Sequence, residues 1–252
     1  MNFKLKKSYI WIITVLLVSC SSNESKFEQN NSKILKEETK EIDTLQPVSK
    51  FVQPRAGLDQ LTDIQTVDKT IQVDLKYATT DNFMHQILYK DIQHLYVQKD
   101  VAARLAKCQQ YLKKINPSYS LLIYDGVRPL SVQQAMWDAL DTIPFNERTK
   151  FVSNPANGSL HNYGAAVDLT ICNEQGVALD MGAGYDDIRE IAYPKFESKF
   201  LETGELTNEQ VENRKLLRKV MRSENFTNIQ TEWWHFNACS RATAKVKYEI
   251  LK

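Results

Sequence analysis

Two separate segments of the chain carry histidine and acidic side chains at spacings that suit a metal ion. The first contains His161 and Asp168, and the second contains Glu232 and His235. Zinc binds histidine nitrogen and carboxylate oxygen at about 2.0 to 2.2 Å, and a catalytic zinc site keeps its fourth position for water. We therefore predict that His161, Asp168 and His235 bind one zinc ion per chain.

Glu232 has no ligand role in this arrangement, yet it lies three residues from the ligand His235. A carboxylate beside a metal site can accept a proton from the attacking water. The pattern therefore predicts metal-assisted hydrolysis with Glu232 as the general base, and the same carboxyl would later protonate the leaving amine. The alternative is an ordinary surface carboxylate, which the closeness to His235 disfavours.

The same segments resemble a known enzyme family. Residues 159–168 read Ser-x-His-x-x-Gly-x-Ala-x-Asp, and Glu-x-x-His follows about 65 residues later. This order resembles the zinc D-alanyl-D-alanine dipeptidases, whose best-known members act in vancomycin resistance. Further segments look like family segments in family order; they are 74–79, 81–83, 124–129, 180–182 and 185–186. The resemblance covers roughly residues 57–240.

The resemblance implies roles for residues outside the ligand set. The residue matching Arg128 stabilises the anionic tetrahedral intermediate, which needs a fixed cation. The residues matching Ser159, Tyr77 and Asp186 hold the termini of a zwitterionic dipeptide. Asp186, helped by Tyr77, would accept the ammonium group, and Ser159 would hydrogen-bond near the C-terminal half. A solvated Arg128, and turn or capping roles for Asp186 and Ser159, are the alternatives.

The resemblance also implies fold and function. The expected fold is α+β, with a central antiparallel sheet flanked by helices. The expected activity is zinc-dependent hydrolysis of the D-alanyl-D-alanine dipeptide, a small peptide substrate. A D,D- or L,D-carboxypeptidase acting on murein stem peptides is one alternative, and the chain departs from many relatives at 84–89, beside the expected pocket mouth. A non-catalytic binding module with a structural zinc is another, but such a module needs neither Glu232 nor Arg128.

The N-terminus has the features of a bacterial lipoprotein signal. Three lysines precede an apolar run at 10–18, which ends just before Cys20. We predict a signal peptide at 1–19, a lipidated Cys20 with a flexible tether at 20–52, and a catalytic domain at 53–252. An uncleaved membrane anchor is the alternative, but the run is short of the roughly 20 residues needed to cross a bilayer.

These features place the mature protein at the bacterial cell envelope, anchored to a membrane by lipid and facing the periplasm or the outer membrane. An exported enzyme cannot reach the cytoplasmic dipeptide pool, so recycling or turnover of cell-wall peptides is the expected role. Removal of residues 1–19 takes away three lysines and no acidic residue, so the formal net charge falls from +1 to −2. Charges of mixed sign recruit no nucleic acid, and the sequence implies no protein partner.

Hydrophobic periodicity and capping residues predict the main elements. The expected strands are 71–77, 121–124 and 165–171, and the expected helices are 100–115 with Asp100 as N-cap, 131–140, and a helix ending near 222 that opens with a capping box at 207–210. In the strand at 165–171, alternation directs Val167 and Leu169 to the core and Asp168 to the other face.

Strand geometry creates a conflict near the C-terminus. Glu232 and His235 are three residues apart, so a regular strand would point them to opposite faces. Both are required near one metal ion, so we predict irregular backbone within 231–234. Trp233 and Trp234 should pack around the site.

The remaining histidines and cysteines have structural interpretations. His85 and His94 are expected to be hydrogen-bonding residues. Cys108 falls in a helical apolar stripe and should be a buried thiol. Cys172 and Cys239 each lie four residues beyond a proposed ligand, which leaves a disulfide between them open but disfavoured.

Overall fold

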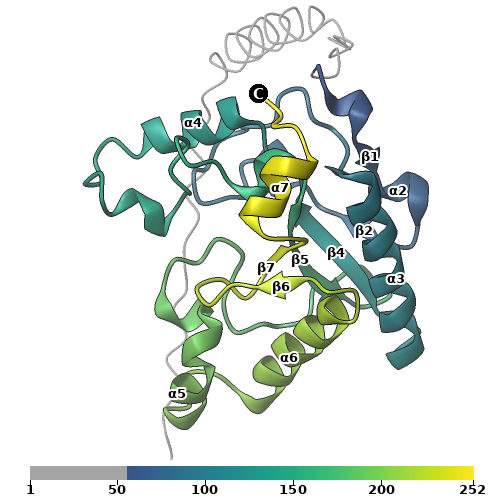
Figure 1. The fold of residues 1–252 in the computed structure, drawn as a ribbon. Helices are drawn as coiled ribbons and strands as arrows, with labels where there is room; N and C mark the ends of the chain where they lie inside the picture. Colours follow the sequence, from purple (N-terminus) through teal and green to yellow (C-terminus); the bar gives the residue numbers. More distant parts are fainter. Residues whose placement is uncertain (1–55) are drawn as a thin grey trace, which may run out of the picture. The chain divides into compact units, whose positions relative to one another are not determined.

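A five-stranded sheet forms the centre of the part of the protein that this computed structural model describes, residues 56–252 (Figure 1). Its strands, in spatial order, are β2 (Gln72–Val73), β4 (Ser120–Asp125), β5 (Ala166–Cys172), β7 (His235–Asn237) and β6 (Thr227–Asn228). Neighbouring strands are antiparallel except for β2, which runs parallel to β4. The predicted α+β fold is confirmed, and the sheet is antiparallel except at this edge.

Two long helices, α3 (Lys99–Ile115) and α6 (Asn208–Arg222), cover one face of the sheet (Figure 1). Leucine and valine side chains from both helices pack in one core cluster against Val167, Leu169 and Ile171 of β5, which are fully buried. Burial of an aliphatic side chain contributes about 1.5 to 3 kcal/mol, so this face supplies much of the hydrophobic stabilisation. The opposite face of β5 is then free to carry polar residues.

Shorter elements surround the other face and the ends of the sheet. They are the helices α2 (Ile64–Val67), α4 (Leu130–Ala139), α5 (Glu197–Glu202) and α7 (Arg241–Lys247), and the paired strands β1 (Thr62–Asp63) and β3 (Tyr96–Val97). Single turns of 3₁₀ helix include η3 (Lys76–Ala78), η4 (Arg148–Lys150) and η5 (Leu160–Tyr163). Because these segments cover the second face, all seven residues of β5 are buried, polar ones included.

Most predicted elements are present, with shifted ends. The helix predicted at 131–140 is α4, and the capping box of Thr207 and Gln210 opens α6 as expected. The helix predicted at 100–115 begins at Lys99, and its N-cap is Gln98, so Asp100 as N-cap was wrong. The Asp100 carboxylate instead accepts hydrogen bonds from Lys247 and Tyr248, which tie α3 to the C-terminal segment.

The strand predicted at 71–77 was wrong beyond Val73. The alternating burial persists, because Ile71, Leu75 and Tyr77 are all buried. The chain nevertheless leaves the sheet after the amide of Asp74 donates to the carbonyl of Ile123, and it coils into η3. Period-two burial therefore continued without strand pairing, and the coil carries Tyr77 into the pocket described below.

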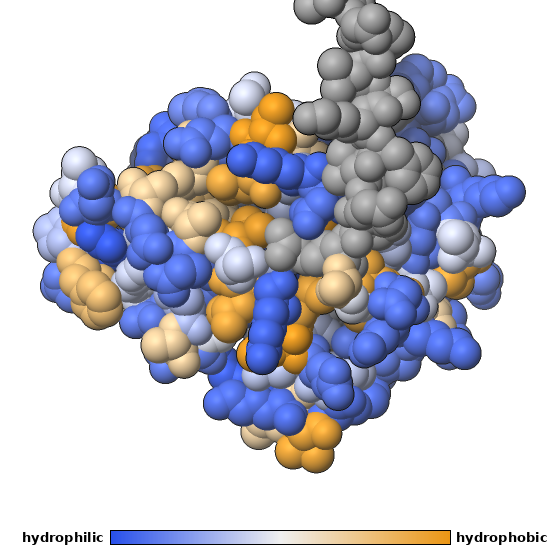
Figure 2. Space-filling view, turned by 90° about the horizontal axis from the view of Figure 1, so that it is seen from above, coloured by the Kyte–Doolittle hydropathy of each residue, from blue (hydrophilic) through white to orange (hydrophobic). Residues whose placement is uncertain are grey.

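Exposed apolar side chains in the described region are scattered. Figure 2 shows a face where hydrophilic residues predominate and apolar residues occur in small groups. The large hydrophobic residues with the greatest exposure include Phe145 and Val246, which lie far apart in sequence. Within residues 56–252, no helix combines the length and apolarity needed to cross a bilayer. The predictions for 1–19, for Cys20 and for the segment 20–52 lie outside the described residues.

Candidate active site

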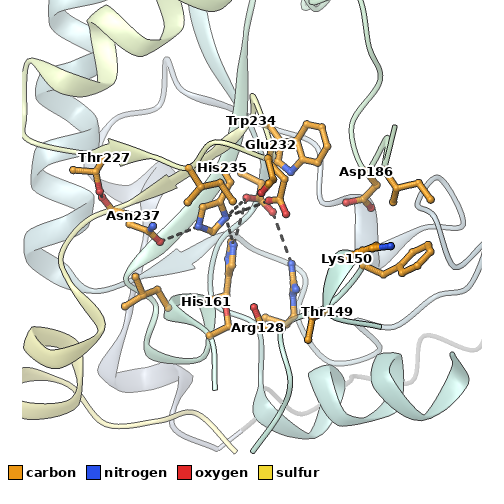
Figure 3. A pocket seen from close by; sticks show the side chains of 18 of the residues that line it. Arg128, Thr149, Lys150, His161, Asp186, Thr227, Glu232, Trp234, His235 and Asn237 are labelled. Atoms are coloured by element: carbon orange, nitrogen blue, oxygen red, sulfur yellow. Dashed lines mark hydrogen bonds and ion pairs between the residues drawn. The ribbon is translucent and has the colours of Figure 1, made fainter. Parts of the chain in front are cut away.

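Strand register brings the predicted metal ligands together. In the antiparallel pair of β5 and β7, Asp168 lies directly opposite His235. Opposed residues point to the same face of a sheet, with Cβ atoms about 4.5 to 5.5 Å apart. His161 comes from η5, just before β5, and Gly164 in the left-handed conformation (φ 61°) turns the chain between them. Figure 3 shows the side chains of His161 and His235 pointing toward one another.

The three ligand atoms form a compact triangle. His161 Nε2 lies 3.2 Å from His235 Nδ1 and 3.4 Å from Asp168 Oδ1, and His235 Nδ1 lies 2.9 Å from Asp168 Oδ1. A tetrahedral metal with ligands at about 2.0 to 2.1 Å separates its ligand atoms by about 3.3 Å. The triangle therefore has the size that a zinc ion requires, and it is the group of potential metal ligands found within the described residues.

Hydrogen bonds fix which nitrogen of each histidine faces the triangle. His161 Nδ1 donates to the carbonyl oxygen of Gly126 at 2.7 Å, and His235 Nε2 donates to Asn237 Oδ1 at 2.8 Å. A protonated nitrogen cannot bind a metal, so these bonds leave His161 Nε2 and His235 Nδ1 as the ligand atoms. Both rings are thereby oriented before any metal arrives.

Asp168 is a buried carboxylate whose two oxygens have separate partners. Oδ1 belongs to the ligand triangle, and Oδ2 accepts a hydrogen bond from the Tyr185 hydroxyl at 3.2 Å. Burial by itself would raise the pKa of Asp168, but His161 and His235 hold it well below its usual range. Burial likewise opposes protonation of His235, yet its bond to Asp168 raises the pKa of His235 to about 9. A metal entering the triangle must displace that proton.

The backbone around Glu232 is irregular, as predicted. Residues 231–234 form bends and coil, and regular strand begins only at His235. Glu232 consequently lies on the same side of the sheet as His235, and its Oε2 is 3.8 Å from His235 Nδ1. Its side chain keeps 34% exposure toward the pocket. Desolvation raises the pKa of Glu232 above its usual value, which suits a group that takes up and returns a proton.

A bulge in β4 adds Asp125 to the site, a residue to which the sequence assigned no role. The register slips between Ile123 and Asp125, which places Asp125 opposite Asp168 on the site face rather than in the core. Asp125 is fully buried and accepts hydrogen bonds from Tyr89 at 2.6 Å and from Arg128 Nη2 at 2.6 Å. The bulge therefore supplies the counter-ion that holds Arg128.

Arg128 lies between the two aspartates. Its Nη2 is 3.8 Å from Asp168 Oδ2, and its guanidinium lies over the ring of Tyr77, 4.8 Å from the centroid. The hydrogen bonds to Asp125 use Nε and Nη2, so the guanidinium retains Nη1 as a further donor. Arg128 is thus a rigidly held cation beside the metal triangle, the geometry that stabilisation of an oxyanion requires.

Asp186 lies across the pocket from the metal ligands and is held by Tyr77. The Tyr77 hydroxyl is 3.2 Å from each Asp186 carboxylate oxygen. Asp186 adopts a left-handed backbone conformation (φ 60°), which is sparsely populated outside glycine and recurs at ligand sites. Burial, reinforced by the charge of Asp168, raises the pKa of Asp186 to about 8. A carboxyl group in this environment would be stabilised in its ionised form by a cation.

Ser159 has the capping role that was the alternative interpretation. Its side chain accepts a hydrogen bond from the amide of His161, and Asn162 completes the capping box of η5. Ser159 also lines the pocket, so its hydroxyl hydrogen stays available to a ligand. The two roles are compatible.

A pocket of about 590 Å³ connects these groups (Figure 3). It is lined by the predicted ligands and by Arg128, Tyr77, Ser159, Asp186 and Glu232. Its volume lies in the usual range of small-molecule sites. Every residue predicted for the site from 56 onward therefore lies in one cavity.

The predictions for the other aromatic, histidine and cysteine residues had different outcomes. Trp233 and Trp234 are buried and pack edge to face beside the site, as expected. His94 Nδ1 lies 3.2 Å from Asp63 Oδ2, an ion-pair contact when the ring is protonated. His85 is exposed at the end of a turn, where it has left-handed backbone (φ 52°). Cys108 is a buried thiol.

The disulfide left open between Cys172 and Cys239 is absent, and both thiols are free. The strands that carry Asp168 and His235 are antiparallel. Cys172, four residues after Asp168, and Cys239, four residues after His235, therefore lie in opposite directions along the sheet. The two steps therefore separate Cys172 from Cys239 instead of bringing them within the Cα distance of about 7 Å that a disulfide spans.

Four residues of the site were not assigned a role from the sequence: Tyr185, Asn237, Asp125 and Gly126. Asp125, Gly126 and Tyr185 lie in the family-like segments 124–129 and 185–186, and Asn237 lies two residues beyond the Glu-x-x-His motif, so the segments themselves were a signal. Gly126 has a steric reason, since a Cβ there would lie 2.7 Å from the carbonyl oxygen of Tyr96. Because Gly126 has no side chain, its backbone can lie close to Tyr96, and in this position its carbonyl oxygen reaches His161.

Comparisons with known proteins agree with the geometry. A model of the peptidase family M15, described as D-ala-D-ala dipeptidase, matches residues 58–251. The D-alanyl-D-alanine dipeptidase of Escherichia coli strain K12 is 32% identical over 177 residues, which cover 70% of this chain and 83% of that protein. The D-alanyl-D-alanine dipeptidase of Enterococcus faecalis strain ATCC 700802 / V583 is 29% identical over 180 residues, covering 66% and 85%.

Similarity to a solved structure is weaker. A structure of the LdcB LD-carboxypeptidase, described in terms of peptidoglycan recognition, is 20% identical, covers 60% of this chain and 63% of its own, and gives a TM-score of 0.33. A TM-score this low supports no conclusion.

Replacement of His161 by alanine tests the ligand triangle. Two remaining ligands hold zinc poorly, so the His161→Ala protein should lose nearly all of its bound metal. Elemental analysis of purified protein, with circular dichroism to verify folding, measures this. A folded variant with full metal occupancy would contradict the ligand assignment.

Asn237→Ala should give an intermediate loss of bound metal in the same elemental analysis. It keeps three ligands but removes the acceptor that orients His235, and loss of such a partner typically weakens metal binding about 10-fold to 100-fold. Thr227→Ala is the matched control, because Thr227 lies opposite Asn237 in the sheet and its hydroxyl donates to the backbone carbonyl of Asn237, not to the side-chain amide that orients His235. It should bind metal as the unmodified protein does.

Proposed function

The chain belongs to the D-Ala-D-Ala dipeptidase family of M15 peptidases, and we propose that it hydrolyses the D-alanyl-D-alanine dipeptide with one zinc ion held by His161, Asp168 and His235. One observation supports this above the others. Three oriented ligand atoms converge beside a carboxylate and a guanidinium that are not ligands. A purely structural metal site needs neither a free carboxylate nor a guanidinium beside its ligands.

The donor set suits zinc. Two imidazole nitrogens and one carboxylate oxygen are a usual catalytic zinc set, in which a fourth position stays open. When bound, zinc would act as a Lewis acid on the substrate carbonyl and would make water a stronger nucleophile near neutral pH. The remaining chemistry comes from the side chains.

Glu232 moves the proton in the proposed reaction. Its carboxylate accepts a proton as water attacks the peptide carbonyl carbon, and the same proton then passes to the leaving amine of the second D-alanine. The raised pKa of Glu232 supports both halves of this exchange, since a weakly basic carboxylate would hold the proton too poorly. Arg128 donates to the carbonyl oxygen as negative charge develops on it.

Asp186 and Tyr77 would hold the ammonium group of the substrate. A half-buried carboxyl group whose pKa is raised to about 8 gains an ion pair from a cation, which stabilises its ionised form. Ser159, beside His161, would hydrogen-bond on the leaving-group side of the scissile bond. The first D-alanine then lies between Asp186 and the metal ligands.

A carboxypeptidase acting on stem peptides is the second candidate. Its substrate would carry an amide and further residues where the dipeptide carries an ammonium group. Asp186 would then face a neutral amide and, with a pKa of about 8, would stay protonated and form no ion pair with the substrate. The position of Asp186 therefore favours the dipeptide.

We also propose that the enzyme is exported and anchored by a lipid on Cys20, on the sequence pattern of residues 1–20 alone. An enzyme outside the cytoplasm meets dipeptides released from the cell wall rather than those awaiting incorporation. Recycling or turnover of wall peptides is the role that this location supports.

Glu232→Gln tests the general base. The amide has the same shape but accepts no proton from water, so the variant should bind zinc normally and lose at least about 100-fold in kcat. Release of D-alanine from D-Ala-D-Ala, with metal content measured on the same sample, provides the readout. Glu174→Gln, on an exposed turn, is the control, and a loss below tenfold in Glu232→Gln would remove Glu232 as the base.

Asp186→Asn tests the ammonium site. Removal of the charge should raise KM for D-Ala-D-Ala more than it lowers kcat, because Asp186 contacts the terminus rather than the reacting atoms. We expect about a 10-fold to 100-fold rise, the range for a hydrogen bond to a charged group at about 1.5 to 3 kcal/mol. Asp187→Asn is the matched control, since Asp187 lines the same pocket but is already paired with Arg189. An unchanged KM in Asp186→Asn would place the ammonium group elsewhere.

Cys20→Ala tests the lipid anchor. The variant should incorporate no labelled fatty acid and should leave the membrane fraction, because residues 56–252 contain no helix able to hold the domain in a bilayer. Fractionation of cells expressing the full chain measures both. Undiminished membrane retention would favour an uncleaved N-terminal anchor.

A further inference from the structure

The pocket continues past the metal ligands along one face of the paired strands β6 and β7. Alternate residues of this segment line it, namely Asn225, Thr227, Ile229 and Thr231 on one side and His235, Asn237 and Cys239 on the other. Alternate residues of an extended chain share a face. Ser240 and Arg241 close the far end. We call the part made by Asn225, Thr227, Asn237, Cys239, Ser240 and Arg241 the leaving-group arm.

The leaving-group arm and the ammonium site lie on opposite sides of the metal ligands. Figure 3 shows Asp186 and Lys150 on one side of His161 and His235, and Thr227 and Asn237 on the other. A substrate whose ammonium group binds Asp186 and whose carbonyl group lies at the ligands must direct its leaving group into the arm. The direction of the chain is thereby set by the proposed function.

The arm is longer than one residue of substrate. From His235 to Asn237 the strand advances two residues, about 7 Å at strand spacing, and the lining continues beyond β7 through Cys239 to Arg241. A single residue of extended peptide spans about 3.3 to 3.6 Å. The second D-alanine of a dipeptide would therefore fill only the part nearest the metal ligands.

The chemistry of the arm suits a polar peptide that ends in a carboxylate. Its side chains are hydroxyl, amide and thiol groups, with Arg241 as a cation at the end, and the acidic residues of the pocket all lie at the metal ligands or on the Asp186 side. Arg241 is exposed, and its Nη1 donates to the carbonyl oxygen of Asn157 at 3.0 Å. That contact orients the guanidinium and leaves other donors for a carboxylate.

We propose that the enzyme removes the N-terminal D-alanine from D,D-peptides longer than the dipeptide, with the added residues in the leaving-group arm and the C-terminal carboxylate at Arg241. This inference rests on the proposed function. In the step, the bond between the first carbonyl carbon and the following nitrogen breaks, water supplies oxygen to that carbon, and the leaving amine receives the proton from Glu232. No reactant besides water is required.

Four substrates test the proposal on the zinc-loaded protein. They are D-Ala-D-Ala, D-Ala-D-Ala-Gly, the amide of that tripeptide, and N-acetyl-D-Ala-D-Ala, with products identified by mass. We expect D-Ala-D-Ala-Gly to release D-alanine with kcat/KM within tenfold of the dipeptide. The acetylated dipeptide should fall at least 100-fold below it, because it offers Asp186 no cation.

The outcomes separate the two proposals. Hydrolysis of the dipeptide with a loss of 100-fold or more on the tripeptide would overturn the leaving-group arm and leave the dipeptidase function intact. Failure to hydrolyse either substrate would overturn both. Equal rates on the acetylated and free dipeptides would overturn the direction of the substrate, and with it the inference.

Variants in the arm tie the effect to these residues. Thr227→Trp fills the arm beside Asn237, so the ratio of kcat/KM for tripeptide to that for dipeptide should fall at least tenfold, whereas Thr227→Ser should keep the ratio. Arg241→Gln should raise KM for the free tripeptide at least fivefold and leave KM for its amide within twofold. An unchanged ratio in Thr227→Trp, or equal effects of Arg241→Gln on acid and amide, would contradict the assignment.

Discussion

The pairing of Asp168 with His235 across β5 and β7 is the contact on which the site depends. It places a buried carboxylate and an imidazole on one face of the sheet, 2.9 Å apart, with the second histidine within 3.4 Å of the same oxygen. Side chains alternate between faces, so a slip of one residue in this register would send one ligand into the hydrophobic core. The apolar packing of Val167 and Phe236 on the opposite face prevents that slip. The core therefore fixes the metal geometry.

A second constraint follows from the bulge in β4. It puts Asp125 opposite Asp168, and two carboxylates facing each other across strands repel. Arg128 resolves the conflict because its guanidinium lies 2.6 Å from one carboxylate and 3.8 Å from the other. The same cation is thus required for folding the site and available for the reaction. Truncation of Arg128 would leave Asp125 buried and unpaired, so lost activity in such a variant would mix a structural cause with a chemical one.

The sequence predicted the residue types of the site and the faces of β5, because metal chemistry and strand period are local properties. It also predicted the break before His235, since Glu232 and His235 could not otherwise share a site. The sequence-based prediction failed where the structure depends on which strands pair and in which register. The segment 71–77 keeps strand periodicity but pairs at only two positions, and the extra residue in β4 changes the face of Asp125 without any change in residue type. The divergence of Cys172 and Cys239 likewise depends on strand direction, which spacing does not record.

The two ends of the pocket select their ligands by different physics. At one end Asp186 lies half-buried beside a tyrosine hydroxyl and has a pKa of about 8, so a ligand that brings a cation keeps its carboxyl group ionised. A ligand without a cation meets a protonated carboxyl group and forms no ion pair with it, so it binds less tightly. At the other end the leaving-group arm offers hydroxyl and amide groups that water can satisfy when a ligand is short. A substrate that is one residue shorter therefore loses little binding free energy at this end. Selection for a free amine and tolerance of length beyond the scissile bond therefore follow from the position of Asp186 at one end of the pocket.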